Sequence, residues 1–98
     1  MPINFRSKLH QALLGHYFSH PNAEHYVRDL SRLLSFNATA LSRELRILTR
    51  SGIFLTSTRD RYKYFRLNPR HPLYKEIRNI TMYVVAKKAT GRGNAKTA

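Results

Sequence analysis

The sequence predicts a small, mainly helical domain that carries one β-hairpin, and three observations lead to this prediction. Apolar residues recur at helical spacing in several separate stretches of the chain. Late in the chain, two short runs of β-branched and aromatic residues follow one another closely. The chain has 98 residues, of which 42% are hydrophobic and 11% are aromatic, and this is enough for one modest core in a single domain.

The chain carries a large excess of positive charge. It contains 18 Lys and Arg against 5 Asp and Glu, which gives a formal net charge of +13. Such an imbalance destabilises a compact fold through self-repulsion, and binding to a polyanion offsets it. Nucleic acid is therefore the first candidate partner, and an anionic membrane surface is the second.

The composition also excludes several classes of protein. Cysteine is absent, which excludes disulfides, thiolate metal sites and a cysteine nucleophile. No apolar run approaches the roughly 18 residues that a membrane span needs, and the N-terminus lacks the apolar region of a secretion signal. We expect a soluble, cytoplasmic, nucleoid-associated protein that has no membrane partner.

The first helix is predicted over residues 5–18, and its apolar arc is wide. Leu14 and Phe18 extend the arc well beyond the ~100° that a one-sided helix needs. The surplus indicates either a thick core within one subunit or contact with a second copy of the chain, and we favour the second copy. The helix ends before Pro21, because proline disfavours a helical conformation in the residue that precedes it.

Two helices joined by a short connection come next. A short extended piece over residues 24–27 leads into a helix over residues 27–34, and residues 35–37 connect it to a third helix that ends before Gly52. This is the helix-turn-helix arrangement, in which the second helix contacts DNA. An ordinary pair of antiparallel helices has similar spacing, and the alternative stays open on spacing alone.

The third helix has two distinct stripes. Asn37 can cap its first turn, and Gly52 suits the left-handed residue that follows a helix. One stripe is apolar and consists of Ala38, Leu41, Leu45 and Leu48. The other is polar and consists of Thr39, Arg43, Arg46 and Arg50. Glu44 is the only acid of the helix and lies off the polar stripe, so the arginines lack ready partners within the helix.

The polar stripe is either a solvated surface or a nucleic-acid contact. Most surface helices have a solvated polar face. Arginine, however, donates well to phosphate oxygens and to O6 and N7 of guanine. The excess of positive charge makes the nucleic-acid contact the better interpretation.

A β-hairpin is predicted from residues 53–58 and 62–67. A three-residue loop, Arg59-Asp60-Arg61, joins the strands and lacks the glycine that such loops prefer. Alternation along the second strand turns Phe65 and Leu67 toward the core. The basic residues that we expect to project outward are Arg59, Arg61, Lys63 and Arg66. Three helices followed by a basic hairpin form the order of a winged helix.

The last helix is predicted over residues 72–88. Pro72 can be its first residue, where a missing amide costs nothing. Like the first helix, it has surplus apolar surface, so we expect residues 5–18 and 72–88 to form a homodimer interface. The winged-helix domain then covers residues 1–89, and residues 90–98 form a disordered basic tail.

The middle of the chain resembles a known family. The segment YVRDLSRLLSFNATALSRELRILTRSGIF, followed by a hairpin that ends in YKYFRLN, resembles winged helix-turn-helix transcriptional regulators of the ArsR-like group. The segment NPRHPLYKEI is similar to a variant found in small regulators and in the leaders of nucleotidyltransferase-domain proteins. The resemblance covers roughly residues 9–80. The cysteine-bearing ligand motif of the metal-sensing members is missing, which excludes a thiol-based metal sensor.

The resemblance implies a homodimer that binds pseudo-palindromic double-stranded DNA and represses or modulates transcription. The implied recognition helix covers about residues 38–51, and the implied wing covers residues 54–67. The residues that we expect to bind DNA are Asn37, Thr39, Ala40, Ser42, Arg43, Arg46, Arg50, Arg59, Arg61 and Lys63. Thr39 and Arg43 are expected at base edges, because the N-terminal part of a recognition helix enters the major groove.

Two other function classes remain open, and two more are disfavoured. An RNA-binding or ribosome-associated winged helix and a protein–protein assembly module both fit a basic surface. A metal site at His16 and His20 is disfavoured, because two ligands are too few, so we expect no cofactor and place His16 at the core edge and His20 at the end of the helix. An enzyme is not expected, because the acids are dispersed and no nucleophile–base pattern stands out.

Overall fold

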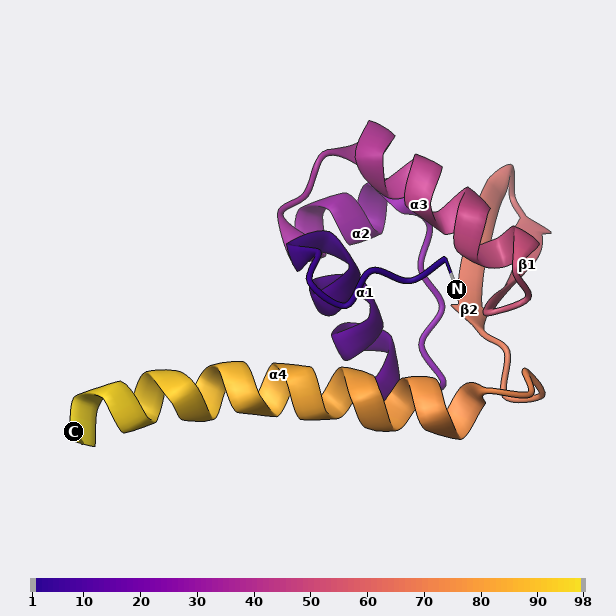
Figure 1. The fold of residues 1–98 in the computed structure, drawn as a ribbon. Helices are drawn as coiled ribbons and strands as arrows, with labels where there is room; N and C mark the ends of the chain where they lie inside the picture. The colour runs from indigo at the N-terminus through magenta and orange to yellow at the C-terminus, as the bar shows by residue number, and fades with distance from the viewer. Residues whose placement is uncertain (1, 98) are drawn as a thin grey trace.

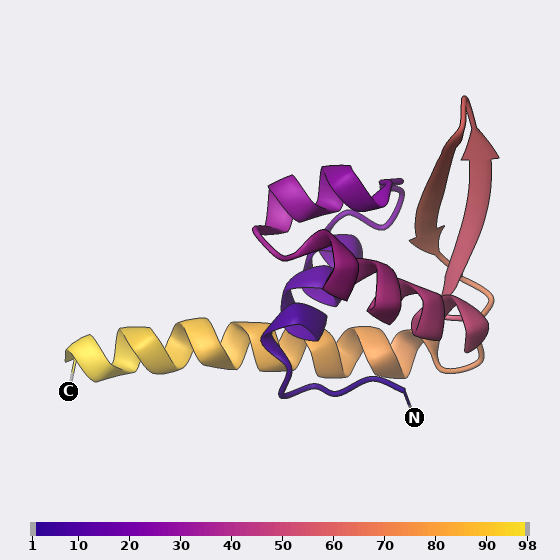
Figure 2. The same ribbon diagram turned by 90° about the horizontal axis from the view of Figure 1, so that it is seen from above.

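The computed structural model of the protein describes residues 2–97, with side chains described for residues 2–87. Its elements are α1 (Lys8–Ser19), α2 (Val27–Leu34), α3 (Ala38–Arg50), β1 (Phe54–Arg59), β2 (Tyr62–Leu67) and α4 (Tyr74–Thr97). The first three helices pack together, and α4 runs along one side of them as a long rod (Figure 1). Seen from above, the hairpin stands beside α3 and projects away from the helices (Figure 2). The predicted fold class, mainly α with a small hairpin in the winged helix-turn-helix order, is confirmed.

The helix-turn-helix follows the predicted local chemistry. Asn37 caps α3, since its side-chain oxygen accepts from the amides of Thr39 and Ala40 at 2.8 and 3.1 Å. Gly52, just past the end of α3, has a φ of 82°, which a residue with a Cβ rarely adopts. Ser35 ends α2 in the left-handed conformation, with a φ of 59°.

Two terminal helices begin later than predicted. α1 begins at Lys8 because Ser7 caps it, accepting from the amide of His10, and Phe5 packs against the core from outside the helix. α4 begins at Tyr74, after a turn in which Nδ1 of His71 accepts from the amide of Leu73. The backbone of α4 continues to Thr97, beyond the predicted end near residue 88. The predicted disordered tail, residues 90–98, lies outside the part of the chain whose side chains the structure describes.

The hairpin has a two-residue turn, so the predicted three-residue loop is wrong. Arg59 pairs with Tyr62 as the last pair of the ladder, which leaves only Asp60 and Arg61 in the turn. Both have positive φ, 50° and 70°, as the twist-matched turn of a two-residue hairpin requires. Asp60 tolerates this conformation through its short polar side chain, whereas Arg61 adopts it at a position that glycine usually occupies.

The hairpin is braced by the segment that precedes α2. His25 and Phe65 form an antiparallel bridge in which each amide donates to the other's carbonyl oxygen, at 3.2 and 2.8 Å. The predicted extended piece over residues 24–27 therefore lies beside β2. The hydroxyl of Tyr17, from α1, also donates to the carbonyl oxygen of Phe65 at 2.7 Å. This support matters because an isolated two-stranded hairpin is marginal in water.

The core joins all the elements and accounts for the wide arc of α1. It includes Leu13 and Tyr17 of α1 together with the three leucines of α3 and the inward side chains of the hairpin. Ala38, predicted as part of the same apolar stripe, is exposed, because it lies in the first turn of α3. Leu14 and Phe18 are buried within the same subunit, Phe18 by edge contact with Tyr74. The surplus apolar surface of α1, from which we expected contact with a second copy, is therefore buried by other elements of the same chain.

α4, by contrast, leaves part of its apolar surface uncovered. Ile77 and Thr81 are buried against the rest of the domain, and a Cβ on Gly15 of α1 would lie 3.3 Å from Val85. Ile80 and Tyr83 of α4 and Leu73, just before the helix, lie to one side of this buried stripe, with exposed fractions of 44%, 63% and 42%. Among the described residues, no helix has both the length and the hydropathy that a membrane span requires.

Candidate nucleic-acid interface

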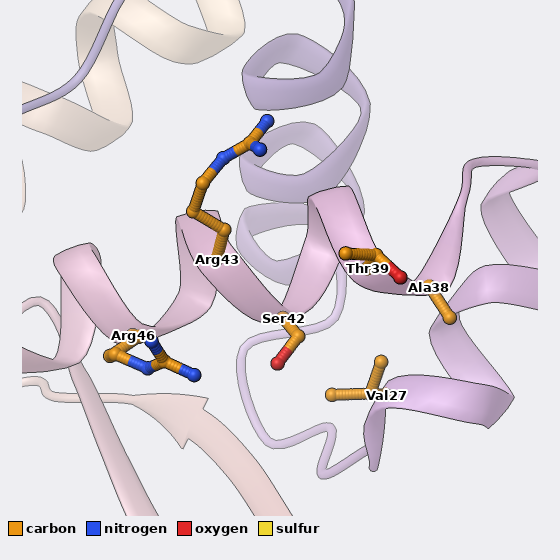
Figure 3. A pocket seen from close by; sticks show the side chains of 6 residues that line it. All are labelled: Val27, Ala38, Thr39, Ser42, Arg43 and Arg46. Carbon is orange, nitrogen blue, oxygen red and sulfur yellow. The ribbon is translucent and has the colours of Figure 1, made fainter.

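The exposed surface of α3 carries the predicted polar stripe. Thr39, Arg43, Arg46 and Arg50 are all exposed. They are held there because Leu41, Leu45 and Leu48, on the opposite side of the helix, are fully buried. A shallow hollow on this surface is lined by Val27, Ala38, Thr39, Ser42, Arg43 and Arg46 (Figure 3).

A second hollow lies between α3 and the hairpin. Arg46 and Arg50 of α3 line it together with Lys63 of β2, and its remaining lining residues are Val27, Ser42, Thr49 and Phe65. Within residues 2–87, none of these three cations forms an ion pair with an acidic side chain. The fold thus brings together two sets of cations that are separate in the sequence, one from the helix and one from the hairpin.

The other basic residues of the hairpin do not face this hollow. Arg59 lies on the opposite face of the sheet from Lys63, because it pairs with Tyr62 while Lys63 pairs with Thr58. Its guanidinium donates to Glu24 at 3.0 Å and stacks over the ring of Tyr64 at 4.2 Å. Arg61 sits in the exposed turn at the tip. Of the three predicted wing residues, only Lys63 therefore joins the arginines of α3.

Three further residues that were predicted to contact DNA differ in how accessible they are. The side-chain oxygen of Asn37 is occupied by capping, although the residue is exposed. Ala40 is half-buried. Ser42 is also half-buried but lines both hollows. Asn37 and Ala40 thus belong to the capped first turn of α3, whereas Ser42 lies where a ligand bound to the polar stripe would contact it.

The expectation that the arginines lack partners within the helix is wrong for Arg43. Its Nε donates to Oε2 of Glu44 at 3.4 Å, and the other oxygen of Glu44 lies 2.8 Å from Nε2 of His10 in α1. The hydrogen bond from His10, aided by Arg43, holds the pKa of Glu44 below its usual range. The sequence offered no indication of the His10 contact, because the two residues are 34 positions apart.

His16 and His20 occupy the structural positions that the sequence predicts. His20 ends α1 with its amide bonded to the carbonyl oxygens of His16 and Tyr17. His16 is half-buried, and its Nε2 lies 2.9 Å from Nε2 of His25, whose Nδ1 bonds to Asp29. Burial, together with the neighbouring His25 and His20, lowers the pKa of His16. Among the described residues, no group of three or more potential ligands could hold a metal ion.

Comparison with known proteins supports the fold. The structure is similar to that of a possible transcriptional regulator from Methanosarcina mazei Go1, with a TM-score of 0.58 and 16% sequence identity. The match covers 95% of this chain and 79% of that chain. No protein-family model matches the sequence, and no curated protein matches it either. At this identity the likeness shows a shared fold.

Proposed function

We propose that this protein is a sequence-specific transcriptional regulator that binds double-stranded DNA, acts as a repressor and has no enzymatic activity. The observation that carries the proposal is the hollow between α3 and β2, where Arg46, Arg50 and Lys63 converge without acidic partners among the described residues. Closely spaced phosphates of a duplex are the ligand that best matches several exposed cations on one surface.

In this proposal α3 enters the major groove as the recognition helix. Thr39 and Arg43, near its N-terminal end, contact base edges. Arg46 and Arg50 contact the phosphates beside the groove, and Lys63 contacts the same backbone from the wing. Arg61, at the tip, reaches the flanking backbone or minor groove. Arg59 contributes less than the sequence suggested, because Glu24 already neutralises it.

The regulator acts as a homodimer in this proposal. The exposed residues Ile80 and Tyr83 lie on one flank of α4, and Leu73, immediately before the helix, precedes Ile80 by seven residues, a spacing found in helix–helix interfaces. A two-fold dimer through this flank would present two recognition helices to a pseudo-palindromic operator. Membership of the ArsR-like group and a place on the nucleoid, in the cytoplasm, belong to the same proposal. The description of the Methanosarcina mazei protein as a possible transcriptional regulator supports the regulatory role in this proposal.

The test begins with selection of bound fragments from random genomic DNA. Fluorescence anisotropy then gives the affinity for the selected duplex, for a scrambled duplex and for a structured RNA of equal length, all at matched salt. We expect the selected duplex to bind tightest. If about six contacts are phosphate contacts, log affinity should fall against log salt with a slope near −5. Preference for the RNA, or no binding of any duplex, would refute the proposal.

A further inference from the structure

A row of hydrogen bonds runs from the N-terminal segment through α1 to the exposed side of α3. The amide of Asn4 donates to Nδ1 of His10 at 2.9 Å. Nε2 of His10 lies 2.8 Å from Oε1 of Glu44, and Nε of Arg43 donates to Oε2 of Glu44 at 3.4 Å. Both oxygens of the carboxylate are therefore engaged, one from the interior and one from the surface.

The direction of each hydrogen bond in this row follows from the first. Because Nδ1 of His10 accepts from a main-chain amide, it carries the lone pair, and the proton of the neutral ring is on Nε2. The ring therefore donates to Glu44. His10 is only 4% exposed, so its orientation is fixed by packing as well as by hydrogen bonds at both nitrogens. The position of the Glu44 carboxylate is consequently set from inside the domain.

The surface end of the row is free to contact a ligand. The side chain of Arg43 is 66% exposed, whereas that of Glu44 is 23% exposed. Figure 3 shows Arg43 extending from α3 in the opposite direction to Ser42. The bond to Glu44 uses Nε, and within residues 2–87 no hydrogen bond engages the two terminal nitrogens of Arg43. These two nitrogens form the planar pair that donates to O6 and N7 of guanine.

The charge of Glu44 calls for an explanation if α3 binds DNA. It is the only acid in α3, and an acid close to phosphates weakens the attraction of a polyanion. A carboxylate that merely filled space at this position would be a disadvantage. A carboxylate that orients an arginine compensates for its charge, because an arginine with one fixed orientation loses less freedom when it binds a base.

We infer that Glu44, held by His10, is a positioning residue that aims the terminal nitrogens of Arg43 at a guanine and so sets the base preference at one position of the operator. The inference rests on the proposed function, since it assumes that α3 contacts base edges. It adds the residues that determine specificity: Arg43 reads the base, Glu44 orients Arg43, and His10 anchors Glu44.

The experiment measures discrimination, which is the ratio of affinities for the selected duplex and for duplexes with single base-pair substitutions. Arg43→Lys keeps the charge but lacks the planar pair, so the base pair at which it loses discrimination is the one that Arg43 reads. Glu44→Gln should lower discrimination at that same base pair by about tenfold and leave other positions unchanged. The affinity of the Glu44→Gln variant for a scrambled duplex should rise, because the substitution removes a negative charge.

Two controls separate positioning from a general effect of charge or stability. Glu76→Gln removes one negative charge from an exposed position in the first turn of α4 and should leave discrimination unchanged. In an Arg43→Ala background, Glu44→Gln should also leave discrimination unchanged, because no arginine remains to be oriented. Thermal unfolding of each variant shows whether it is folded at the assay temperature.

A second measurement uses the wild-type chain and does not depend on how the variants fold. In the DNA complex, the Nε proton of Arg43 should exchange with water more slowly than that of Arg46, as followed by NMR. Equal exchange rates would overturn the inference, as would wild-type discrimination in Glu44→Gln. Failure of the wild-type protein to bind any duplex refutes the proposed function and the inference together. Selective binding by the wild type with no change in Glu44→Gln refutes the inference alone.

Discussion

Two surfaces of this molecule are exposed for different physical reasons. The basic face consists of Arg46, Arg50 and Lys63 between α3 and β2. The apolar flank consists of Ile80 and Tyr83 on α4 and Leu73 just before it. Charged side chains are well hydrated, so exposing the basic face costs little free energy unless like charges lie close together. Exposed apolar area costs about 25 cal/mol per Å², so the apolar flank is stabilised only when something covers it.

The difference between the two surfaces gives them opposite responses to salt. Binding at the basic face should weaken steeply as salt screens the charges and as counterion release loses its advantage. Association through the apolar flank should change little with salt or become slightly stronger. The two surfaces can therefore be tested separately in one titration series.

The largest effect is expected from breaking the apolar flank. The double variant Ile80→Glu and Tyr83→Glu places charges where a dimer would bury them, and should convert the protein to a monomer. Loss of the second half-site should lower affinity for a two-half-site operator by about 10²–10⁴-fold. Sedimentation velocity measures the subunit count, and anisotropy measures the affinity.

The matched control for that variant is Lys75→Glu, an exposed position on the same helix. It changes the net charge by the same two units but leaves the apolar flank intact. It should remain a dimer and lose only the affinity that its charge change accounts for. A wild-type protein that sediments as a monomer at every concentration would show that the apolar flank is not a dimer interface.

A smaller effect is expected from one cation of the basic face. Arg46→Ala should weaken binding to all sequences by about 1.5 kcal/mol, or roughly tenfold, because a charged hydrogen bond to phosphate is lost. The salt slope should become shallower by about 0.9, and dimerisation should be unaffected. Arg78→Ala, at an exposed position of α4, removes the same charge elsewhere and should leave the slope unchanged.

The features that the sequence predicted correctly depend on neighbours close in the chain. The cap at Asn37, the glycine after α3 and the inward side chains of β2 each follow from local geometry or a repeating pattern. The polar stripe of α3 and the three leucines of its apolar stripe also follow from a repeating pattern, whereas Ala38, predicted as part of the apolar stripe, is exposed. Local patterns also sufficed to predict which elements exist and in which order.

The features that the sequence did not predict depend on distant partners. His10 meets Glu44 across 34 positions, and Arg59 meets Glu24 across 35. The first contact fixes the acid that pairs with Arg43, which was expected to lack a partner in its helix. The second neutralises Arg59, which was expected only to project outward. The wide arc of α1 was also ambiguous, because a helix pattern shows how much surface needs covering but not whether α4 of the same chain covers it.

Acid pH should destabilise the contacts that hold the hairpin before it destabilises the packing of α4. Burial lowers the pKa of His16, so the unfolded chain binds the proton more readily than the folded chain. The free energy of unfolding should therefore be constant above about pH 6.5 and fall as the pH decreases below that value. His25, the partner of His16, pairs with Phe65, so the protection of the Phe65 amide, relative to the intrinsic exchange rate at each pH, should fall at acid pH before protection in α4 does.

Hydrogen exchange followed by NMR between pH 5 and 8 measures this effect once each rate is divided by the intrinsic rate of the amide at that pH. His16→Gln should remove most of the pH dependence in the wing near pH 6. His71→Gln, at a histidine outside this cluster, should retain it. An unchanged profile in His16→Gln would assign the acid sensitivity to another group.

The smallest effect compares two buried hydroxyls, one in each region. Thr81 of α4 and Thr49 of α3 each have a side-chain oxygen that is buried and finds no hydrogen-bond partner among the described residues. Valine has nearly the same shape without the polar atom, so Thr81→Val should raise the free energy of unfolding by about 1 kcal/mol, as urea denaturation measures. Thr49→Val should be stabilising by a similar amount. Because Thr81 packs away from the basic face while Thr49 lines it, Thr81→Val should leave DNA affinity unchanged. A loss of stability in either variant would mean that its hydroxyl is hydrogen-bonded in solution.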